Sequence, residues 1–178
     1  MKEKINSLNE EQDIFTDKVK KLLELQFQEA PPLAHVHSFG CQQNVSDGEK
    51  IKGILSTMGY GFTDNMYDAD LIIYNTCAVR ENAESKVFGN VGELKHLKNA
   101  NPDLIIGLCG CMAQQEHIVE KIRKTYRHVD MVFGTFAMLN LPTILFEVLT
   151  ERKRVYDISD LDNQIHEGVN VIREGKIK

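Results

Sequence analysis

The sequence lacks several features that would mark a familiar class of protein. No apolar run in its 178 residues reaches the length of a membrane-spanning segment. The polar N-terminus, MKEKINSLNEEQD, is unlike a signal peptide or a transit sequence. With a formal net charge of -5, the chain has no excess of positive charge with which a small module could bind nucleic acid by charge alone. We therefore expect a cytoplasmic protein without membrane contact.

The motifs of several common enzyme classes are also missing. There is no Gly-x-Gly-x-x-Gly and no Walker-type Gly-Lys-Ser/Thr, so the phosphate loops of dinucleotide and triphosphate sites are absent. No serine lies in a Gly-x-Ser-x-Gly turn, and no histidine can be placed as the partner of a catalytic cysteine. These absences leave the cysteines as the chemistry to explain.

From residue 33 onward, short apolar runs alternate with amphipathic stretches, a pattern typical of parallel strands joined by crossover helices. The sequence therefore predicts an α/β fold. Its sheet would be open and mostly parallel, with four to five strands and helices on both faces, as in a flavodoxin-like or Rossmann-like three-layer sandwich. The predicted strands are 33–39, 71–75, 104–108 and 131–133, with a further one at 154–158.

Two segments flank this predicted domain, which we place at residues 33–150. Residues 1–32 predict one amphipathic helix outside the main domain, because apolar residues recur at helical spacing before a pair of prolines. Residues 151–178 are mostly polar and end without a stop signal or an apolar anchor. We expect them to be a linker, and the chain to be the first part of a longer polypeptide.

The four cysteines follow the ends of predicted strands. Cys41 follows the first strand, Cys77 the second, and Cys109 and Cys111 the third. Because the carboxyl ends of parallel strands meet at one edge of a sheet, these thiols should converge there. The N-termini of the following helices favour the thiolate form. Three or four converging thiolates in a reducing compartment predict a site for an iron–sulfur cluster or a zinc ion.

Other interpretations of the same residues stay open at this point. The cysteines could be small packing residues, or the edge of the sheet could hold a flavin, as in a flavodoxin-like binding module. A zinc site would favour closely paired cysteines, and only Cys109 and Cys111 come close to that spacing. His35 and His37 share one strand face and could be ligands, although a strand histidine is more often a half-buried hydrogen-bonding residue.

Three segments around the cysteines resemble the motifs of one enzyme family. They are Ser38–Asn44 (SFGCQQN), Asn75–Ala83 (NTCAVRENA) and Gly110–Gln114 (GCMAQ). In order and spacing they resemble the three cysteine motifs of the N-terminal domain of radical-SAM methylthiotransferases, over about residues 33–149. Gln42-Gln43-Asn44 and the stretch VRENAESKVFG at 79–89 are similar to the tRNA-modifying MiaB branch of that family. The ribosomal-protein branch typically has Pro-Lys-Asn after its first cysteine.

The resemblance implies an enzyme that adds a methylthio group to N6-isopentenyladenosine beside the anticodon of tRNA. It implies that Cys41, Cys77 and Cys111 hold an auxiliary 4Fe-4S cluster, with Cys109 as a bystander. Three ligands for four irons would leave one iron open to bind or surrender sulfur. Arg80, in the turn after Cys77, would offset the negative charge of the cluster or reach substrate; alternatively, it is a solvent-facing residue at the start of a helix.

In this family, a second 4Fe-4S cluster and S-adenosylmethionine bind to a domain marked by Cys-x-x-x-Cys-x-x-Cys. That motif is absent from this sequence. The resemblance therefore implies that the chain lacks the radical-SAM domain and is inactive alone, with residues 151–178 leading toward that domain. We expect tRNA to be the partner of the complete enzyme, and the protein to be a monomer.

Overall fold

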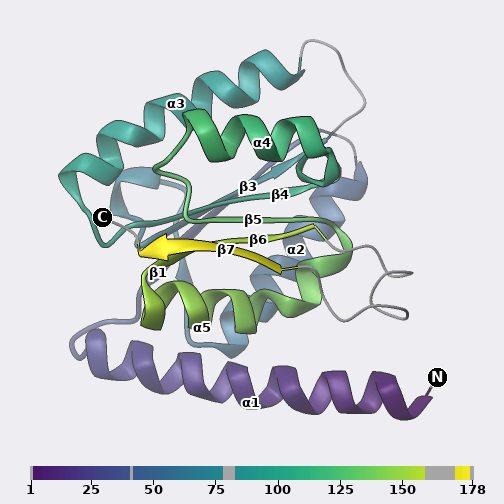
Figure 1. Ribbon diagram of the computed structural model, residues 1–178. Helices are drawn as coiled ribbons and strands as arrows, with labels where there is room; N and C mark the ends of the chain where they lie inside the picture. Colours follow the sequence, from purple (N-terminus) through teal and green to yellow (C-terminus); the bar gives the residue numbers. More distant parts are fainter. Residues whose placement is uncertain (1, 41, 78–82, 159–170, 177–178) are drawn as a thin grey trace.

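The structure of the protein is a computed structural model that describes residues 2–40, 42–77, 83–158 and 171–176. These residues form one sheet of seven strands between two layers of helices (Figure 1). The strands are β1 (Leu33–Phe39), β2 (Gly61–Phe62), β3 (Leu71–Thr76), β4 (Ile105–Gly110), β5 (Met131–Phe133), β6 (Lys153–Asp157) and β7 (Val171–Lys176).

The strands lie in the order β2-β1-β3-β4-β5-β6-β7. The first six are parallel, and β7 runs antiparallel to β6. The order from β2 to β5 is that of flavodoxin-like sheets, in which the strand order reverses between β1 and β3 and ligands bind beyond the strand ends at that point. The predicted α/β class with an open, mostly parallel sheet is therefore confirmed.

The sheet is larger than the four to five strands predicted. The predicted strands are all present, with bounds that agree to within two residues. β2 and β7 were not predicted, because β2 spans two residues and β7, with the sequence VIREGK, has the polar composition of an edge strand. β6 is an interior strand in which Val155 and Tyr156 are buried, so the sheet extends past residue 150, into the segment predicted as a linker.

Helices cover both faces of the sheet, and each face has its own apolar cluster (Figure 1). Since β3 and β4 are covered on both sides, every residue of these two strands is buried.

None of the helices in the described part of the chain has the length and apolar character of a membrane span. The covering helices are α2 (Gln42–Thr57) and α5 (Leu141–Glu151) on one face, and α3 (Ala83–Ala100) and α4 (Glu116–Thr125) on the other.

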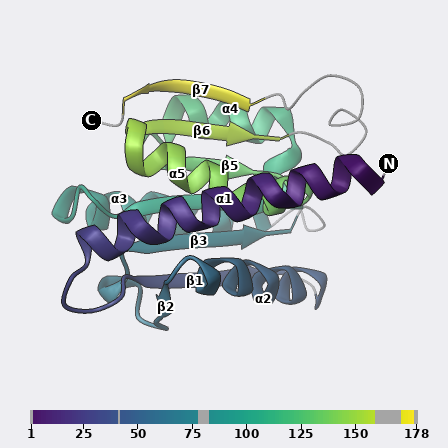
Figure 2. The same ribbon diagram turned by 90° about the horizontal axis from the view of Figure 1, so that it is seen from below.

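The N-terminal helix, α1 (Lys2–Gln26), lies along the outer side of α5 (Figures 1 and 2). The rings of Phe15 and Phe146 meet edge to face with their centroids 5.3 Å apart. Val19 and Leu23 are buried in the same cluster as the apolar residues of α2 and α5. The predicted helix is confirmed, but it was expected outside the main domain and its apolar stripe instead extends the core. The domain limits at residues 32 and 150 stay predictions.

Truncating Leu23 tests the packing of α1. Leu23→Ala should lower the free energy of unfolding by about 2–5 kcal/mol, because it leaves a cavity among buried side chains. Leu25→Ala is the matched control on the same helix: Leu25 is 72% exposed, so its truncation should change stability by less than about 0.5 kcal/mol. Urea unfolding of both variants measures the difference. Equal effects would contradict the packing of α1 on the domain.

Candidate functional site

The strand register places the cysteine-bearing turns next to one another. Phe39 of β1 is opposite Thr76 of β3, and Thr76 is opposite Gly110 of β4. The next residues along the chain, which are Gly40, Cys77 and Cys111, therefore leave three adjacent strands at the same level. Cys41 follows Gly40 directly and lies outside the described residues. The backbone register thus brings the turns of Cys77 and Cys111 to the carboxyl edge of the sheet.

Cys77 and Cys111 are both free thiols. Cys77 is 7% exposed, and Cys111 is partly exposed in a short 3₁₀ helix, η2 (Cys111–Gln114). The Sγ atom of Cys111 lies 3.7 Å from Oγ1 of Thr135, which follows β5. Either the thiol of Cys111 or the hydroxyl of Thr135 can be the donor in this contact.

Two glycines allow the turns to approach so closely. Gly110 has φ +97°, and a Cβ atom there would collide with the carbonyl oxygen of Thr76. Gly40 has φ +141°, and a Cβ atom there would collide with the Cβ atom of Cys77. Both conformations and both contacts require glycine. The two glycines therefore let the turns after β1 and β4 pack closely against Thr76 and Cys77 at the end of β3.

Cys109 differs from the other two described cysteines. Its side chain is 1% exposed and lies in the apolar cluster shared with α2 and α5. Burial, with a smaller contribution from the negative charge of Asp47, raises the pKa of the Cys109 thiol well above its usual range. A neutral thiol in an apolar core is a packing residue rather than a ready ligand. This supports its expected role as a bystander, which stays a prediction.

The histidines of β1 do not join the cysteines. The rings of His35 and His37 stack with centroids 6.1 Å apart, on the same strand face as Phe39. Nδ1 of His35 donates to the carbonyl oxygen of Thr63 at 3.1 Å, which is the hydrogen-bonding role expected of a strand histidine. The His37 side chain is exposed. The loss of some hydration, and to a smaller extent repulsion from a charged His35, lower the pKa of His37.

The metal-binding prediction is tested only in part, since Cys41 and Arg80 lie outside the described residues. Within the ranges that are described, no group of three or more His, Cys, Asp or Glu side chains could hold a metal ion. Two of the three predicted ligands, Cys77 and Cys111, directly follow the ends of adjacent strands, and Cys41 follows Gly40 in the sequence. The donor set at this edge is therefore compatible with a thiolate-bound cluster.

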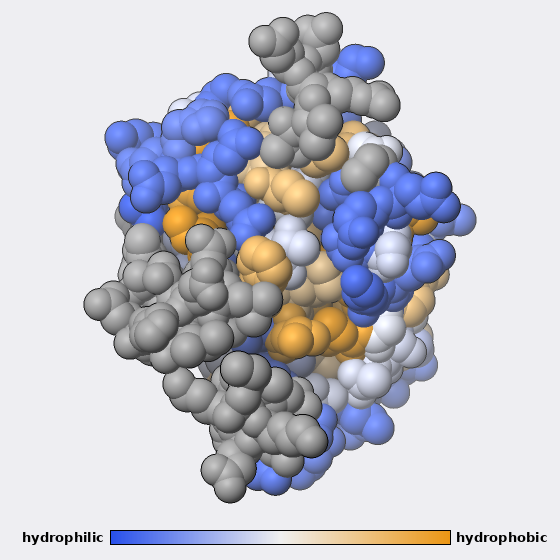
Figure 3. Space-filling model, turned by 90° about the vertical axis from the view of Figure 1, so that its right-hand side faces the viewer, coloured by the Kyte–Doolittle hydropathy of each residue, from blue (hydrophilic) through white to orange (hydrophobic). Residues whose placement is uncertain are grey.

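The carboxyl edge is apolar between polar rims, as Figure 3 shows. Elements that meet at this edge carry exposed apolar side chains: Val45 in the first turn of α2, and Phe136 and Leu139 in the 3₁₀ helix after β5, η3 (Phe136–Asn140). Apolar surroundings limit the access of water to a cluster.

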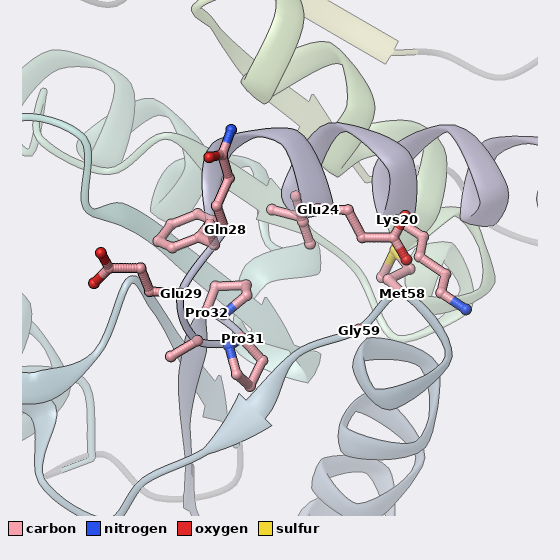
Figure 4. A pocket seen from close by; sticks show the side chains of 11 residues that line it. Lys20, Glu24, Gln28, Glu29, Pro31, Pro32, Met58 and Gly59 are labelled. Carbon is pink, nitrogen blue, oxygen red and sulfur yellow. The ribbon is translucent and has the colours of Figure 1, made fainter.

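A hollow of about 340 Å3 lies elsewhere, between the end of α1 and the turn from α2 into β2 (Figure 4). Pro31 and Pro32, which line it, lead into the start of β1, so this hollow is at the opposite edge of the sheet from the cysteines. It has no cysteine in its lining and is not part of the site.

Sequence reasoning did not predict that polar side chains would be buried beside the cysteines. Asn44 and Asn75 are each 1% exposed, and Thr76 is fully buried. Thr76 Oγ1 donates to the carbonyl oxygen of Cys109 at 2.7 Å, and Asn44 Nδ2 donates to the carbonyl oxygen of Thr76 at 3.1 Å. The sequence feature that could have indicated this burial is the position of Asn44, Asn75 and Thr76 within the cysteine motifs, directly after apolar runs or near their ends.

Replacing Gly110 tests the close approach of β3 and β4. Gly110→Ala should lower the free energy of unfolding by about 1–3 kcal/mol, because the Cβ atom meets Thr76 and the backbone has positive φ. Gly53→Ala is the control: Gly53 lies in α2 with nothing within 4 Å of its Cβ position, so alanine should stabilise the protein by about 0.5–1 kcal/mol. Thermal unfolding compares the two. A neutral Gly110→Ala would contradict this geometry.

Comparison with known proteins agrees with the resemblance in the cysteine motifs. The model of the family described as "Uncharacterized protein family UPF0004" matches residues 34–134. The tRNA-2-methylthio-N(6)-dimethylallyladenosine synthase of Acetivibrio thermocellus is 50% identical over 143 residues, which cover 80% of this chain and 30% of that protein.

Two further relatives have the same name. The synthase of Clostridioides difficile is 44% identical over 171 residues, covering 95% of this chain and 36% of the relative. The synthase of Caldicellulosiruptor saccharolyticus is 47% identical over 139 residues, which cover 78% of this chain and 30% of that relative. The chain thus spans about a third of the length of the curated relatives it matches. With more than half of its length matched by the family model, the chain belongs to the UPF0004 family.

Proposed function

We propose that this chain is the cluster-binding N-terminal part of a tRNA methylthiotransferase. The complete enzyme converts N6-isopentenyladenosine, next to the anticodon, to its 2-methylthio derivative. The observation that carries this proposal is the row formed by Gly40, Cys77 and Cys111 at the ends of three adjacent strands. It occurs in a chain that is 44–50% identical to synthases named for this product.

In this proposal Cys41, Cys77 and Cys111 bind an auxiliary 4Fe-4S cluster. Such a cluster, with one iron free of protein ligands, supplies a place for sulfur to bind and leave. The chain's own residues hold the thiolates and shape their surroundings. Thr135 places a hydroxyl 3.7 Å from the Cys111 sulfur. Gly40 keeps a side chain out of the space beside Cys77, and Gly110 does the same beside Thr76. Arg80 is proposed to offset the negative charge of the site.

The rest of the reaction is assigned to the part of the relatives that this chain does not span. A second 4Fe-4S cluster and S-adenosylmethionine are proposed to bind there, since the Cys-x-x-x-Cys-x-x-Cys motif is absent here. With a net charge of -5, this chain is proposed to leave most tRNA binding to that part as well. We place the enzyme, as a monomer, in the cytoplasm, where reduced thiols and tRNA occur together.

Cluster loading tests this proposal. After anaerobic incubation with iron and sulfide, the chain should turn brown and hold about four irons and four sulfides. Cys41→Ala, Cys77→Ala and Cys111→Ala should each lose the colour and most of the iron, because each removes one of three ligands. Cys109→Ala is the matched control and should keep both. Iron analysis and absorption spectra measure the outcome.

Two results would overturn the assignment. If Cys109→Ala loses as much iron as the other three variants, Cys109 is a fourth ligand and no iron of the cluster is free of protein ligands. If the chain retains stoichiometric flavin and never retains iron or sulfide, the flavodoxin-like binding module is the better account, as the strand order alone would allow.

A further inference from the structure

Two asparagines beside the cysteines are hydrogen-bonded to each other in a buried position. Asn75 Nδ2 donates to the main-chain carbonyl oxygen of Asn44 at 2.7 Å, and Asn44 Nδ2 lies 3.3 Å from Asn75 Oδ1, to which it donates. Both residues are 1% exposed. Ser38 of β1 joins them, since its hydroxyl donates to the carbonyl oxygen of Asn44 at 3.0 Å. The pair therefore links β1, the first turn of α2 and the end of β3.

The same pair connects the turns that carry the cysteines. Asn44 is three residues after Cys41 and lies in the first turn of α2. Its side chain donates to the carbonyl oxygen of Thr76, the residue before Cys77. Thr76 in turn donates to the carbonyl oxygen of Cys109, two residues before Cys111. Hydrogen bonds thus run without a break across the three strands whose ends bear the proposed ligands.

The amide of Asn75 donates a hydrogen bond through Nδ2 and accepts one through Oδ1, because an amide has a donor and an acceptor side by side. Apolar residues of the same size would pack here but would leave the carbonyl oxygens of Asn44 and Thr76 with fewer partners. The preceding residues on the same face of β3, Leu71 and Ile73, are aliphatic and buried in the core. The amides are therefore an exception to the apolar composition of this core, and they occur where the cysteine turns meet.

We propose that Asn44 and Asn75 are positioning residues, which hold the turns of Cys41 and Cys77 at the separation that one cluster requires before the cluster is bound. This inference rests on the proposed function. If the turns were free to move apart, ordering them would reduce the free energy gained on cluster binding. Groups that orient metal ligands in this way commonly change metal affinity when they are removed.

The test compares iron release from the loaded chain in Asn44→Ala, Asn75→Ala and the double variant. Each single variant should release iron to a chelator about 10- to 100-fold faster than the wild type, which is the range found for groups that orient ligands. The double variant should release iron more slowly than the product of the two single effects predicts, because the bond from Asn44 Nδ2 to Asn75 Oδ1 is already lost in either single variant. The electron paramagnetic resonance spectrum of the reduced cluster should change in all three.

Asp130→Asn is the matched control for a loss of stability alone. Asp130 is a buried residue at the opposite edge of the sheet, where its carboxylate binds Lys98 Nζ at 2.8 Å and the backbone N–H of Ile106 at 2.8 Å. This variant should lower the melting temperature of the cluster-free protein and leave both iron release and the spectrum unchanged. If Asn75→Ala does not fold, Asn75→Asp replaces it in the test. Aspartate has the same size but lacks the donor to the carbonyl oxygen of Asn44, so this variant should also release iron faster and change the spectrum.

The outcomes separate the inference from the proposed function. If the asparagine variants release iron no faster than Asp130→Asn at an equal loss of melting temperature, or if their spectra match the wild type, the pair has a structural role only and the inference is overturned. If the wild-type chain takes up no iron at all, the proposed function fails, and the inference fails with it.

Discussion

The register of three parallel strands is the constraint on which the rest of this structure depends. Phe39, Thr76 and Gly110 form one row across β1, β3 and β4. A shift by one residue would exchange the side chains that pack into the two apolar clusters, so packing on both sides of β3 and β4 fixes this alignment. The apolar core thereby decides where the chain leaves the sheet, and hence where the cysteines lie.

The two edges of the sheet carry different kinds of buried polar contact. At the amino edge, Lys98 and Asp130 form a buried ion pair, and Arg154 donates to the carbonyl oxygens of Val129 and Ile122 near the end of α4. These contacts join helix ends to strand starts. At the carboxyl edge, neutral amides and hydroxyls join the turns that bear the cysteines.

Much of this arrangement could be predicted from the sequence. Apolar periodicity gave the strands at 33–39 and 131–133 with their observed bounds, and parallel topology then implied that the cysteines converge. The two-residue β2 could not be predicted because so short a segment has no periodicity. The burial of Val19 and Leu23 depends on α5, which is more than a hundred residues away in sequence. The contacts of Asn44 and Asn75 likewise depend on tertiary packing that no local pattern encodes.

The central claim is that three cysteines, and not four, hold one cluster at this edge. Mössbauer spectroscopy of the chain, loaded anaerobically with isotopically labelled iron, tests it most directly because the method distinguishes iron sites by their ligands. The account predicts a 4Fe-4S cluster in which one iron differs from the other three and changes its signal when an exogenous thiol or sulfide is added. Four iron sites that are equivalent and unaffected by added sulfide would contradict it.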